Sequence, residues 1–283
     1  MRILVTGAGG QLGPYLIDAV SRAGCELIAW RGRDEVDLTD ADAVRQAYER
    51  AAADVVIHAA AMSRPALAFA EPEAAQAVNV DATRQLVELA DRAGARLIYV
   101  STDMVFDGEA APYAESAATA PRSVYGRTKL AGEKEVLAVA ANMVVRVSLL
   151  YGPSRRSGFK TLFDQQVAAM RAGEKARLFE DEWRTPLAIN DAAAGLVAAA
   201  QSEARGLYHL GGPERLSRFE MGRQLAELLG APASCLQGCS RLSIESDEPR
   251  PRDLSLDSTR WSQAFAHSPR RRFTDAARAF LNI

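Results

Sequence analysis

A glycine-rich turn directly after the first apolar run constrains the fold of this chain more than any other feature. The run Ile3–Thr6 leads into Gly7-Ala8-Gly9-Gly10-Gln11-Leu12-Gly13, and a helical pattern follows. Between a strand and a helix, such a turn aims backbone N–H groups and the helix N-terminus at a pyrophosphate. Glycines also make ordinary tight turns, so the surrounding strand and helix carry the prediction. We predict a dinucleotide site whose cofactor-binding residues include Gly7, Gly10, Gln11, Leu12 and Gly13.

The first half of the chain alternates short apolar runs with longer helical patterns. This alternation is typical of βαβ units, in which helices cover both faces of a parallel sheet. Gly24 and Gly94 stand where two of these helices should end, because a left-handed C-terminal cap favours glycine. The pattern predicts an α/β fold with a Rossmann-type, doubly wound parallel sheet. The expected strands are Ile3–Thr6, Glu26–Trp30, Asp54–His58, Arg96–Val100 and Met143–Ser148.

The pattern changes after about Tyr151, where the polar loop Pro153–Gly158 precedes a helix. Ser217 and Glu220 have capping-box spacing ahead of a later helix that ends near Gly230. We predict a dinucleotide-binding domain over residues 1–150, with part of 186–210. A smaller C-terminal lobe over residues 151–185 and 211–283 is expected to bind the substrate.

Charge and composition narrow the class of protein. A net charge of −2 gives no general attraction for polyanions, so nucleic acid is not an expected partner. No apolar run approaches the roughly 20 residues of a membrane-spanning helix, and Met1–Val5 leads into a glycine turn instead of a cleavage site. We expect a cytoplasmic protein with no membrane partner. The cysteines and histidines lack metal-site spacing, so no metal is predicted.

The end of the second expected strand indicates which dinucleotide is preferred, because the adenosine ribose lies there. A protein that binds NAD places a carboxylate at this point, whereas this chain has Trp30-Arg31-Gly32-Arg33 before its first acid, Asp34. Arg31 and Arg33 can bind a 2′-phosphate through charge-assisted hydrogen bonds. NADP, in its reduced form NADPH, is therefore the predicted cofactor. The alternative is that both arginines are solvated in a surface loop.

Tyr125 and Lys129 are four residues apart, which places both side chains on one face of a helix. An ammonium group beside a phenol lowers the pKa of the phenol and makes it a better proton donor or acceptor. Most such pairs on surface helices are inert. This pair follows the fourth expected strand, whose end carries Ser101-Thr102-Asp103, and ligands of open α/β sheets bind at such strand ends. The arrangement favours a site for proton transfer.

Taken in order, these segments resemble the extended short-chain dehydrogenase/reductase family. The residues that carry the resemblance are the glycine triplet, His58-Ala59-Ala60-Ala61, Asn79, Ser101–Gly108 and Tyr125-Gly126-Arg127-Thr128-Lys129. Ser101–Gly108 and Ala120–Glu133 are most similar to dTDP-4-dehydrorhamnose reductases, and Arg250–Asp257 looks like a motif in the substrate lobe of that group. The resemblance covers nearly the whole chain. It implies an NADP-dependent reductase that acts on a 4-keto group of a nucleotide-activated deoxysugar.

The resemblance also implies roles for individual residues. Tyr125 is expected to be the general acid, Lys129 to hold the nicotinamide ribose and tune Tyr125, and Thr102 to polarise the substrate carbonyl. A ketone that receives hydride develops negative charge on oxygen, which two hydroxyl donors would stabilise. Ser101 is the competing hydroxyl, because side chains alternate along a strand and only one of the two can face the site. The remaining cofactor contacts are expected from Asp37, Leu38, Ala59, Ala60, Ala61 and Asn79.

Two departures from the reductase pattern leave alternatives open. Met104 stands where these reductases usually have tyrosine, and Arg184 stands where a small residue is more usual. One alternative is a nucleotide-sugar epimerase or dehydratase, for which Asp103 is a candidate acid. The other is a non-catalytic NADP-binding protein like the regulatory subunit of methionine adenosyltransferase, which shares the arginine-proline-arginine element. The complete set of Thr102, Tyr125 and Lys129 favours an enzyme.

A nucleoside diphosphate requires cations, and we expect them in the second lobe. The alternative for each arginine is a solvated basic loop. Arg270-Arg271-Arg272 is expected to be surface charge. The resemblance suggests a homodimer through the helices before and after the fourth strand. The candidates for substrate binding are Asp103, Arg250 and Arg252, with Arg155 or Arg156.

Overall fold

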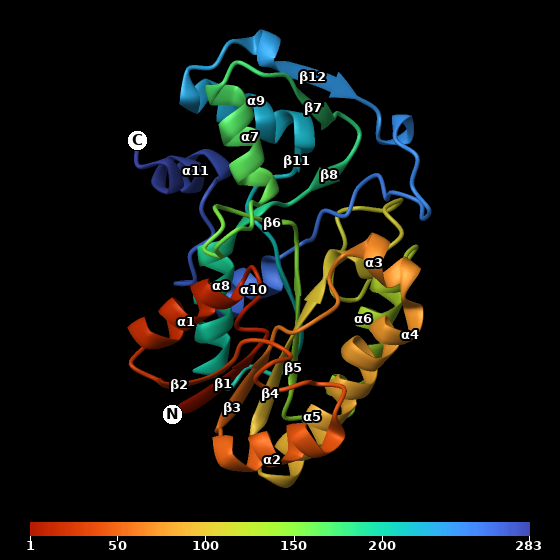
Figure 1. The fold of residues 1–283 in the computed structure, drawn as a ribbon, viewed down its shortest axis with the longest axis vertical. Helices are drawn as coiled ribbons and strands as arrows, with labels where there is room; N and C mark the ends of the chain where they lie inside the picture. The colour runs from red at the N-terminus through yellow and green to blue at the C-terminus, as the bar shows by residue number, and fades with distance from the viewer.

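The computed structural model describes residues 1–283. Its centre is a sheet of six strands in which every neighbouring pair is parallel (Figure 1). Five of these strands are the expected ones with small shifts at their ends, so the doubly wound parallel sheet is confirmed. From edge to edge the strands are β2 (Glu26–Trp30), β1 (Arg2–Thr6), β3 (Val55–His58), β4 (Arg96–Thr102), β5 (Met143–Val147) and β10 (Gly206–Leu210).

The direction of winding reverses at β1, which has β2 on one side and β3 on the other. At such a reversal, the connections after two neighbouring strands turn to opposite faces of the sheet and leave a crevice between them. The glycine turn follows β1, and Ala59–Ala61 follows β3. The topology alone therefore places both segments beside the crevice in which a ligand of this fold binds.

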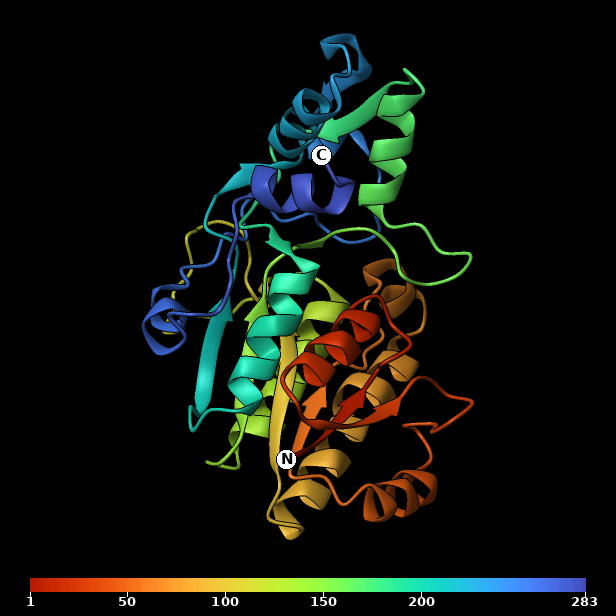
Figure 2. The ribbon, with the colours of Figure 1, turned by 90° about the vertical axis from the view of Figure 1, so that its left-hand side faces the viewer.

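Helices cover both faces of the sheet, because successive residues of each strand bury their side chains on opposite sides. Ile3 packs on the face that carries α1 (Gly13–Arg22) and α8 (Ile189–Ala200), two helices that lie side by side in Figure 2. Leu4 packs on the other face. The helices of that face are α2 (Ala41–Ala51), α5 (Ala82–Arg92) and α6 (Val124–Leu137).

The helix boundaries follow from local chemistry. Gly24 and Gly94 adopt a φ of +68° just past α1 and α5, so the expected glycine caps are confirmed. A run of short helices that no pattern predicted leads into α5 and lies against α6. This run of short helices consists of α3 (Pro65–Ala70), α4 (Pro72–Gln76) and a single π-helical turn, η1 (Ala77–Asp81).

No helix combines the length and the hydropathy needed to cross a membrane.

The chain beyond β5 builds a second group of elements, which lies above the ends of the strands in Figure 1. Its apolar cluster includes Tyr151, Phe163 and Phe273. The expected capping box is confirmed, since Ser217 Oγ accepts a hydrogen bond from Glu220 N and the Glu220 carboxylate accepts one from Ser217 N. The elements are β6 (Leu150–Tyr151), α7 (Leu162–Arg171), β7 (Ala176–Phe179), β8 (Trp183–Arg184), β9 (Leu187–Ala188), β11 (Leu216–Ser217), α9 (Arg218–Leu229), η3 (Ala233–Cys235), β12 (Leu236–Cys239), η4 (Arg241–Ser243) and α11 (Phe273–Leu281).

The segment between these elements and the C-terminus returns to the sheet. Trp261 of α10 (Thr259–Ala264) is fully buried in the apolar cluster that also contains α1 and α8. Arg270-Arg271-Arg272, which follow α10, were expected to be surface charge. This expectation is wrong for Arg271. Its guanidinium binds the buried carboxylate of Asp191 through Nε and Nη2, at 3.0 and 2.6 Å from Oδ1. This pair ties the chain before α11 to α8.

Candidate active site

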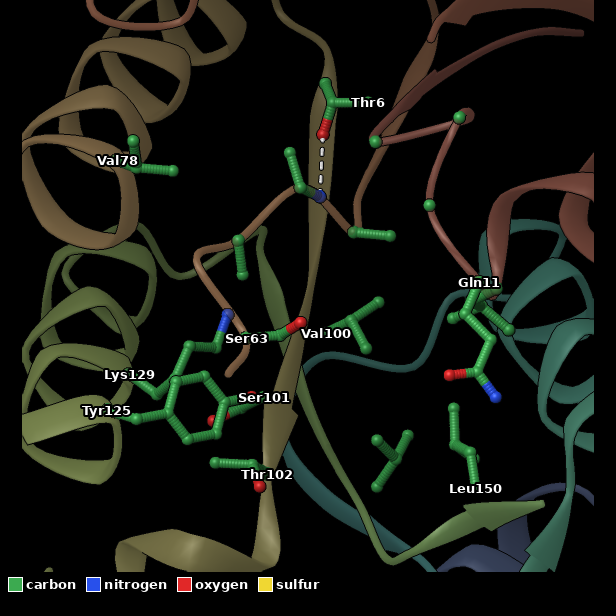
Figure 3. Close-up of a pocket in the computed structure, with 18 of the residues that line it drawn as sticks. Thr6, Gln11, Ser63, Val78, Val100, Ser101, Thr102, Tyr125, Lys129 and Leu150 are labelled. Carbon is green, nitrogen blue, oxygen red and sulfur yellow. Dashed lines mark hydrogen bonds between the residues drawn. The ribbon is translucent and has the colours of Figure 1, made fainter. Parts of the chain in front are cut away.

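A cavity of about 590 Å³ runs along the carboxyl ends of β1, β3 and β4. Its lining includes the end of β2 and the glycine turn on one side and the start of α6 on the other. Figure 3 shows Gln11 and Leu150 on one side of it and Tyr125 and Lys129 on the other. The cavity thus joins the two regions that the sequence marked separately, the dinucleotide turn and the proton-transfer pair.

The glycines of the turn are required by close approaches of backbone to backbone. Gly7 has a φ of +70°, and a Cβ added there would lie 2.6 Å from Ala60 N. A Cβ at Gly9 would lie 2.1 Å from the carbonyl oxygen of Arg31, and one at Gly13 would lie 2.0 Å from that of Ala8. Of the expected cofactor residues in the turn, Gly13 alone does not line the cavity and acts through this packing. The residues that do line it are Gly7, Gly10, Gln11 and Leu12.

Beyond the glycine turn, away from Tyr125, the cavity is lined by Arg31, Arg33, Asp37 and Leu38, which follow β2. Both arginines are largely exposed and each is matched with an acid, Arg31 with Glu35 at 3.2 Å and Arg33 with Asp37 at 3.5 Å. Hydrogen bonds from Thr39 lower the pKa of Asp37, whose carboxylate is thereby used within its own turn. Exposed pairs of this kind are weak. The two guanidinium groups are consequently available to an anion.

Ala59, Ala60 and Ala61 line the cavity as expected, but Asn79 does not. The Asn79 side chain is fully buried; its Oδ1 accepts from Met62 N at 2.8 Å and its Nδ2 lies 3.0 Å from Thr128 Oγ1. The expectation of a direct cofactor contact is therefore not supported for Asn79. Its amide fixes the segment after β3 to α6, the helix that carries the proton-transfer pair.

Tyr125 and Lys129 enter the cavity because of how α6 begins. Ser123 caps the helix, with its Oγ accepting a hydrogen bond from Gly126 N at 3.0 Å. Gly126 lets the helix lie against the chain after β4, since a Cβ there would be 2.3 Å from Met104 O. Both side chains are buried within the protein yet line the cavity beside Thr102 (Figure 3). The structure therefore brings the three expected catalytic residues together.

The two competing hydroxyls at the end of β4 have different partners. Ser101 Oγ donates to the carboxylate of Glu133, which also forms a buried ion pair of 2.6 Å with Arg146. Thr102 Oγ1 lies 3.3 Å from Asp103 Oδ1, a longer and weaker contact. Because the proton of Ser101 is already used, Thr102 is the hydroxyl that is available as a donor in the cavity. This supports the assignment of the polarising role to Thr102.

The ionisation of Tyr125 differs from the expectation. Burial raises the pKa of the Tyr125 phenol; a hydrogen bond with Thr102 opposes this shift and the carboxylate of Asp103 adds to it. Burial lowers the pKa of Lys129 to about 7, and Glu133 opposes that shift. The expected lowering of the Tyr125 pKa by Lys129 is wrong for this structure, because desolvation dominates both groups. Tyr125 therefore keeps its proton at neutral pH, but its raised pKa makes it a weaker proton donor than an exposed phenol.

Buried charges close the cavity beyond Thr102. Asp103 receives a hydrogen bond from Ser148 Oγ at 3.2 Å, and Arg184 Nε lies 3.6 Å from its Oδ2. Burial raises the pKa of Asp103, and the charge of Arg184 opposes this shift. Arg218 lies beside Arg184 in the lining and donates from Nε to Glu182 Oε1 at 3.0 Å. The sequence marked Arg184 only as a departure from the family, and no pattern pointed to Arg218.

A second cavity of about 390 Å³ adjoins the first and shares Met104, Arg184 and Arg218 with it. Arg250 lines this second cavity, with Nη1 3.8 Å from Glu182 Oε2. Arg252 lines neither cavity, and its guanidinium lies 5.5 Å from the centroid of the Trp183 ring. Of the two expected substrate arginines in this segment, the structure therefore places only Arg250 at the site.

The loop after β6 separates its two arginines. Arg155 points away from the cavity, because its guanidinium binds Asp18 of α1 and lies 4.1 Å from the centroid of the Tyr15 ring. The expected substrate contact of Arg155 is therefore not supported. Arg156 lines the cavity together with Gln11, Leu12 and Leu150.

The whole chain, residues 1–283, matches the family described as RmlD substrate binding domain. The chain belongs to this family. A dTDP-4-dehydrorhamnose reductase of Streptomyces griseus is 35% identical over 272 residues, which cover 93% of this chain and 88% of that protein. The match confirms the expected resemblance to extended short-chain dehydrogenase/reductases of this group.

Two further proteins are similar to this chain over nearly its whole length. Methionine adenosyltransferase 2 subunit beta of Pongo abelii is 32% identical over 276 residues, covering 92% of this chain and 81% of that protein. The solved structure of a dTDP-4-dehydrorhamnose reductase from Clostridium acetobutylicum has a TM-score of 0.90 at 25% identity, over 100% of this chain and 99% of that chain. The family resemblance therefore extends to the complete fold.

Proposed function

We propose that this chain is an NADP-dependent reductase that converts a 4-keto group of a nucleotide-activated deoxysugar into an alcohol. The observation that carries the proposal is the single cavity that joins the glycine turn to Thr102, Tyr125 and Lys129. The relative from Streptomyces griseus is named a dTDP-4-dehydrorhamnose reductase, and its likeness spans both parts of this chain. This supports both the class of reaction and the class of substrate.

The residues along the cavity fit a dinucleotide. The glycine turn presents backbone free of side chains ahead of the N-terminus of α1, which suits a pyrophosphate. Arg31 and Arg33 suit a 2′-phosphate at one end, and Lys129 suits the nicotinamide ribose at the other. When bound, NADPH supplies the hydride that reduces the carbonyl carbon of the sugar.

Tyr125 provides the proton in this scheme. As the π bond of the carbonyl breaks, its electron pair moves to the oxygen, which takes the proton from the Tyr125 hydroxyl. Thr102 donates a hydrogen bond to the same oxygen and stabilises the charge that develops there. The place of the Tyr125 side chain in the cavity beside Thr102 supports its role as the acid.

Arg184, Arg218 and Arg250 are the cations for the substrate diphosphate in this proposal. They surround Glu182, and Asp103 adds a second carboxylate. Of their contacts with these acids, only that of Arg218 has hydrogen-bond length. Arg184 Nη1 also donates to Trp183 O at 2.7 Å, so the donors left for phosphate oxygens are the other nitrogens of Arg184 and the guanidinium of Arg250. Asp103 stands next to Thr102, where it can accept a hydrogen bond from a sugar hydroxyl.

The decisive experiment is turnover of NADPH by the purified protein against a panel of nucleotide-linked keto sugars. We expect oxidation of NADPH with a dTDP-linked 4-keto-6-deoxysugar and a slower reaction with NADH. A Thr102→Val, Tyr125→Phe double variant is the blank for non-enzymatic oxidation. Tight binding of NADPH without reduction of any sugar in the panel would reject the proposed activity.

The relative named methionine adenosyltransferase 2 subunit beta favours a second candidate function, a regulatory NADP-binding subunit. The test is co-elution of this chain with the methionine adenosyltransferase of its own source. A stable complex together with absent sugar reduction would establish this function in place of the reductase. Sugar reduction without a complex would reject it.

We also propose a homodimer through α5 and α6, the helices before and after β4. These helices pack against each other, and Leu137 at the end of α6 is 40% exposed. Sedimentation equilibrium is the test, with Leu137→Glu expected to shift the protein towards a monomer. A monomeric parent at micromolar concentration would contradict the proposal.

A further inference from the structure

The ammonium group of Lys129 is buried without a carboxylate of its own. Lys129 is 1% exposed. Glu133, one turn further along α6, is the nearest acid on the same helix face, but its carboxylate binds Arg146 through Nε and Nη2 and accepts from Ser101. A buried cation without a paired acid is costly unless another group stabilises it. The question is therefore what keeps Lys129 charged at the cavity.

The group that lies against Lys129 is the ring of Tyr99 in β4. Lys129 Nζ is 3.8 Å from the ring centroid, within the distance at which the negative face of an aromatic ring attracts a cation. Tyr99 is fully buried and Lys129 is 1% exposed, so water screens this contact little. A cation held against a ring in the absence of water is stabilised more than one at the surface.

The ring is fixed from two sides. Tyr99 Oη donates a hydrogen bond of 3.2 Å to the carbonyl oxygen of Asn79 in the π-helical turn η1. Gly132 leaves the space for this arrangement, because a Cβ at that position of α6 would lie 2.4 Å from Tyr99 Oη. The glycine in the helix and the extra residue in the π turn both serve to place one aromatic ring below Lys129.

We propose that Tyr99 is a positioning residue, whose ring face keeps the Lys129 ammonium group charged and holds it at the cavity. The contact itself is independent of the reaction; its consequence for catalysis rests on the proposed reductase function. Tyr99 does not touch the substrate in this proposal and acts only through Lys129.

A modest attraction from the Tyr99 ring is sufficient to change the charge state of Lys129, because burial lowers the pKa of Lys129 to about 7. Near neutral pH the charge state is then finely balanced, and removal of an attractive ring moves the balance towards the neutral amine. His58 of β3 also faces Lys129, but burial lowers the pKa of His58 to about 3, so it is uncharged. The other titratable groups near Lys129 are Tyr99 itself, Tyr125 on the same helix, and Glu133, whose carboxylate is paired with Arg146 of β5. Asp103 lines the same cavity.

The direct test is the titration of Lys129 by NMR in protein labelled with ¹³C-lysine. The chain has four lysines, Lys129, Lys134, Lys160 and Lys175, so assignment by a Lys129→Arg variant is simple. In Tyr99→Leu we expect the midpoint of Lys129 to fall by about 0.4–1.5 pH units. Tyr99→Phe keeps the ring and should titrate like the parent. An unchanged midpoint in Tyr99→Leu would overturn the proposal, and so would a rise, since a rise indicates that water has entered.

A ring of similar size with the opposite charge distribution separates the effect of the ring face from that of packing. Incorporation of pentafluorophenylalanine at position 99 inverts the charge of the ring face, so the Lys129 midpoint should fall below that of Tyr99→Phe. Equal midpoints for the two rings would overturn the proposal even if Tyr99→Leu does not fold. The matched control is Tyr48→Leu, because Tyr48 is buried in the same apolar cluster, away from Lys129. It should leave the midpoint unchanged.

The NADPH dissociation constant provides the functional measurement. Tyr99→Leu should weaken NADPH binding at pH 8 more than at pH 6, because the amine is protonated again at the lower pH. A purely structural defect would weaken binding equally at both values and would contradict a role through charge. Since neither this measurement nor the lysine titration requires a sugar substrate, failure of the proposed reductase activity would not be confused with failure of this inference.

Discussion

At the scale of single residues, burial decides what Tyr125 can do. Its phenol is desolvated and therefore protonated at neutral pH, so it can act as a proton donor and not as a base when the carbonyl oxygen becomes negative. Tyr125→Phe removes only the hydroxyl, and we expect the single-turnover rate of hydride transfer to fall by about 10²–10⁴-fold with little change in NADPH affinity. Tyr48→Phe is the control, since the Tyr48 hydroxyl has no hydrogen-bond partner. A parent-like rate in Tyr125→Phe would remove Tyr125 from the role of acid.

Arg31 tests the choice of cofactor at the same scale. Its guanidinium lines the cavity and is engaged only by the exposed pair with Glu35. One charge-assisted contact to a 2′-phosphate is worth about 1.5–3 kcal/mol, and exposure places this site at the lower end. We expect Arg31→Ala to reduce the preference for NADPH over NADH by about tenfold in a binding titration. Arg45→Ala, which breaks a comparable exposed pair, should not change it. An unaltered preference in Arg31→Ala would show that the 2′-phosphate lies elsewhere.

The positions of residues within a single strand, turn or helix could be predicted from the sequence, whereas contacts between residues far apart in the sequence could not. The glycine turn and the spacing of Tyr125 and Lys129 depend only on a strand, a turn and a helix. Arg155 and Arg156 are neighbours with equal chemistry, and the anchor that turns one of them away is Asp18, far upstream in α1. Asn79 shares the motif of the family but is directed inward by Met62 and Thr128. No periodicity contains such information.

At the scale of elements, the chain from Glu248 to Asp257 joins the second group of elements to α6, the helix that carries Tyr125 and Lys129. Glu248 accepts a hydrogen bond of 2.6 Å from Val124 N at the start of α6. Arg250 and Arg252 lie in different surroundings, so Arg250→Ala and Arg252→Ala form a matched pair of variants. We expect Arg250→Ala to raise the KM for the nucleotide sugar about tenfold or more and Arg252→Ala to leave it nearly unchanged, with NADPH affinity equal in both. A larger effect from Arg252→Ala would contradict the placement of the diphosphate.

The regular elements were predictable because their signals are local. Five strands and the glycine caps of α1 and α5 lie where apolar runs and glycines indicated. The π turn η1 lies in a continuous helical stretch of sequence and depends on Tyr99 and Thr83 reaching the carbonyl of Asn79. The grouping of Arg184, Arg218 and Arg250 around Glu182 depends on β8 and α9 lying together, as the contact of Arg218 with Glu182 shows. Both features are products of tertiary packing.

At the scale of the whole molecule, two uncharged buried histidines set the response to acid. Burial lowers the pKa of His58 to about 3 and that of His209 to about 4, whereas both groups in the unfolded chain take up protons below about 6.5. At pH values between the folded and the unfolded pKa of each histidine, the unfolded state binds more protons than the folded state. The free energy of unfolding therefore falls as the pH falls. From pH 7 to pH 5 the two groups together would cost about 4 kcal/mol.

Calorimetry at pH 7 and pH 5 measures this loss as a lower Tm. His58→Gln should reduce the difference in Tm between the two pH values, whatever its effect at pH 7. His267→Gln is the control, because His267 is exposed and should leave the difference unchanged. Equal values of Tm at both pH values in the parent would contradict the neutral, buried state of these histidines.

The edge strand β10 has a consequence for how the protein is made. It pairs with β5, yet about 60 residues of chain separate the two, which corresponds to about 3–12 s of translation at 5–20 residues per second. During that interval the emerging β5 presents a row of unpaired N–H and C=O groups, the kind of edge that recruits foreign strands. Trp261, which seals the same cluster, leaves the ribosome later still. A message cut short before the codon for Gly206 would thus yield an aggregating product, and not a smaller enzyme with its nucleotide site intact.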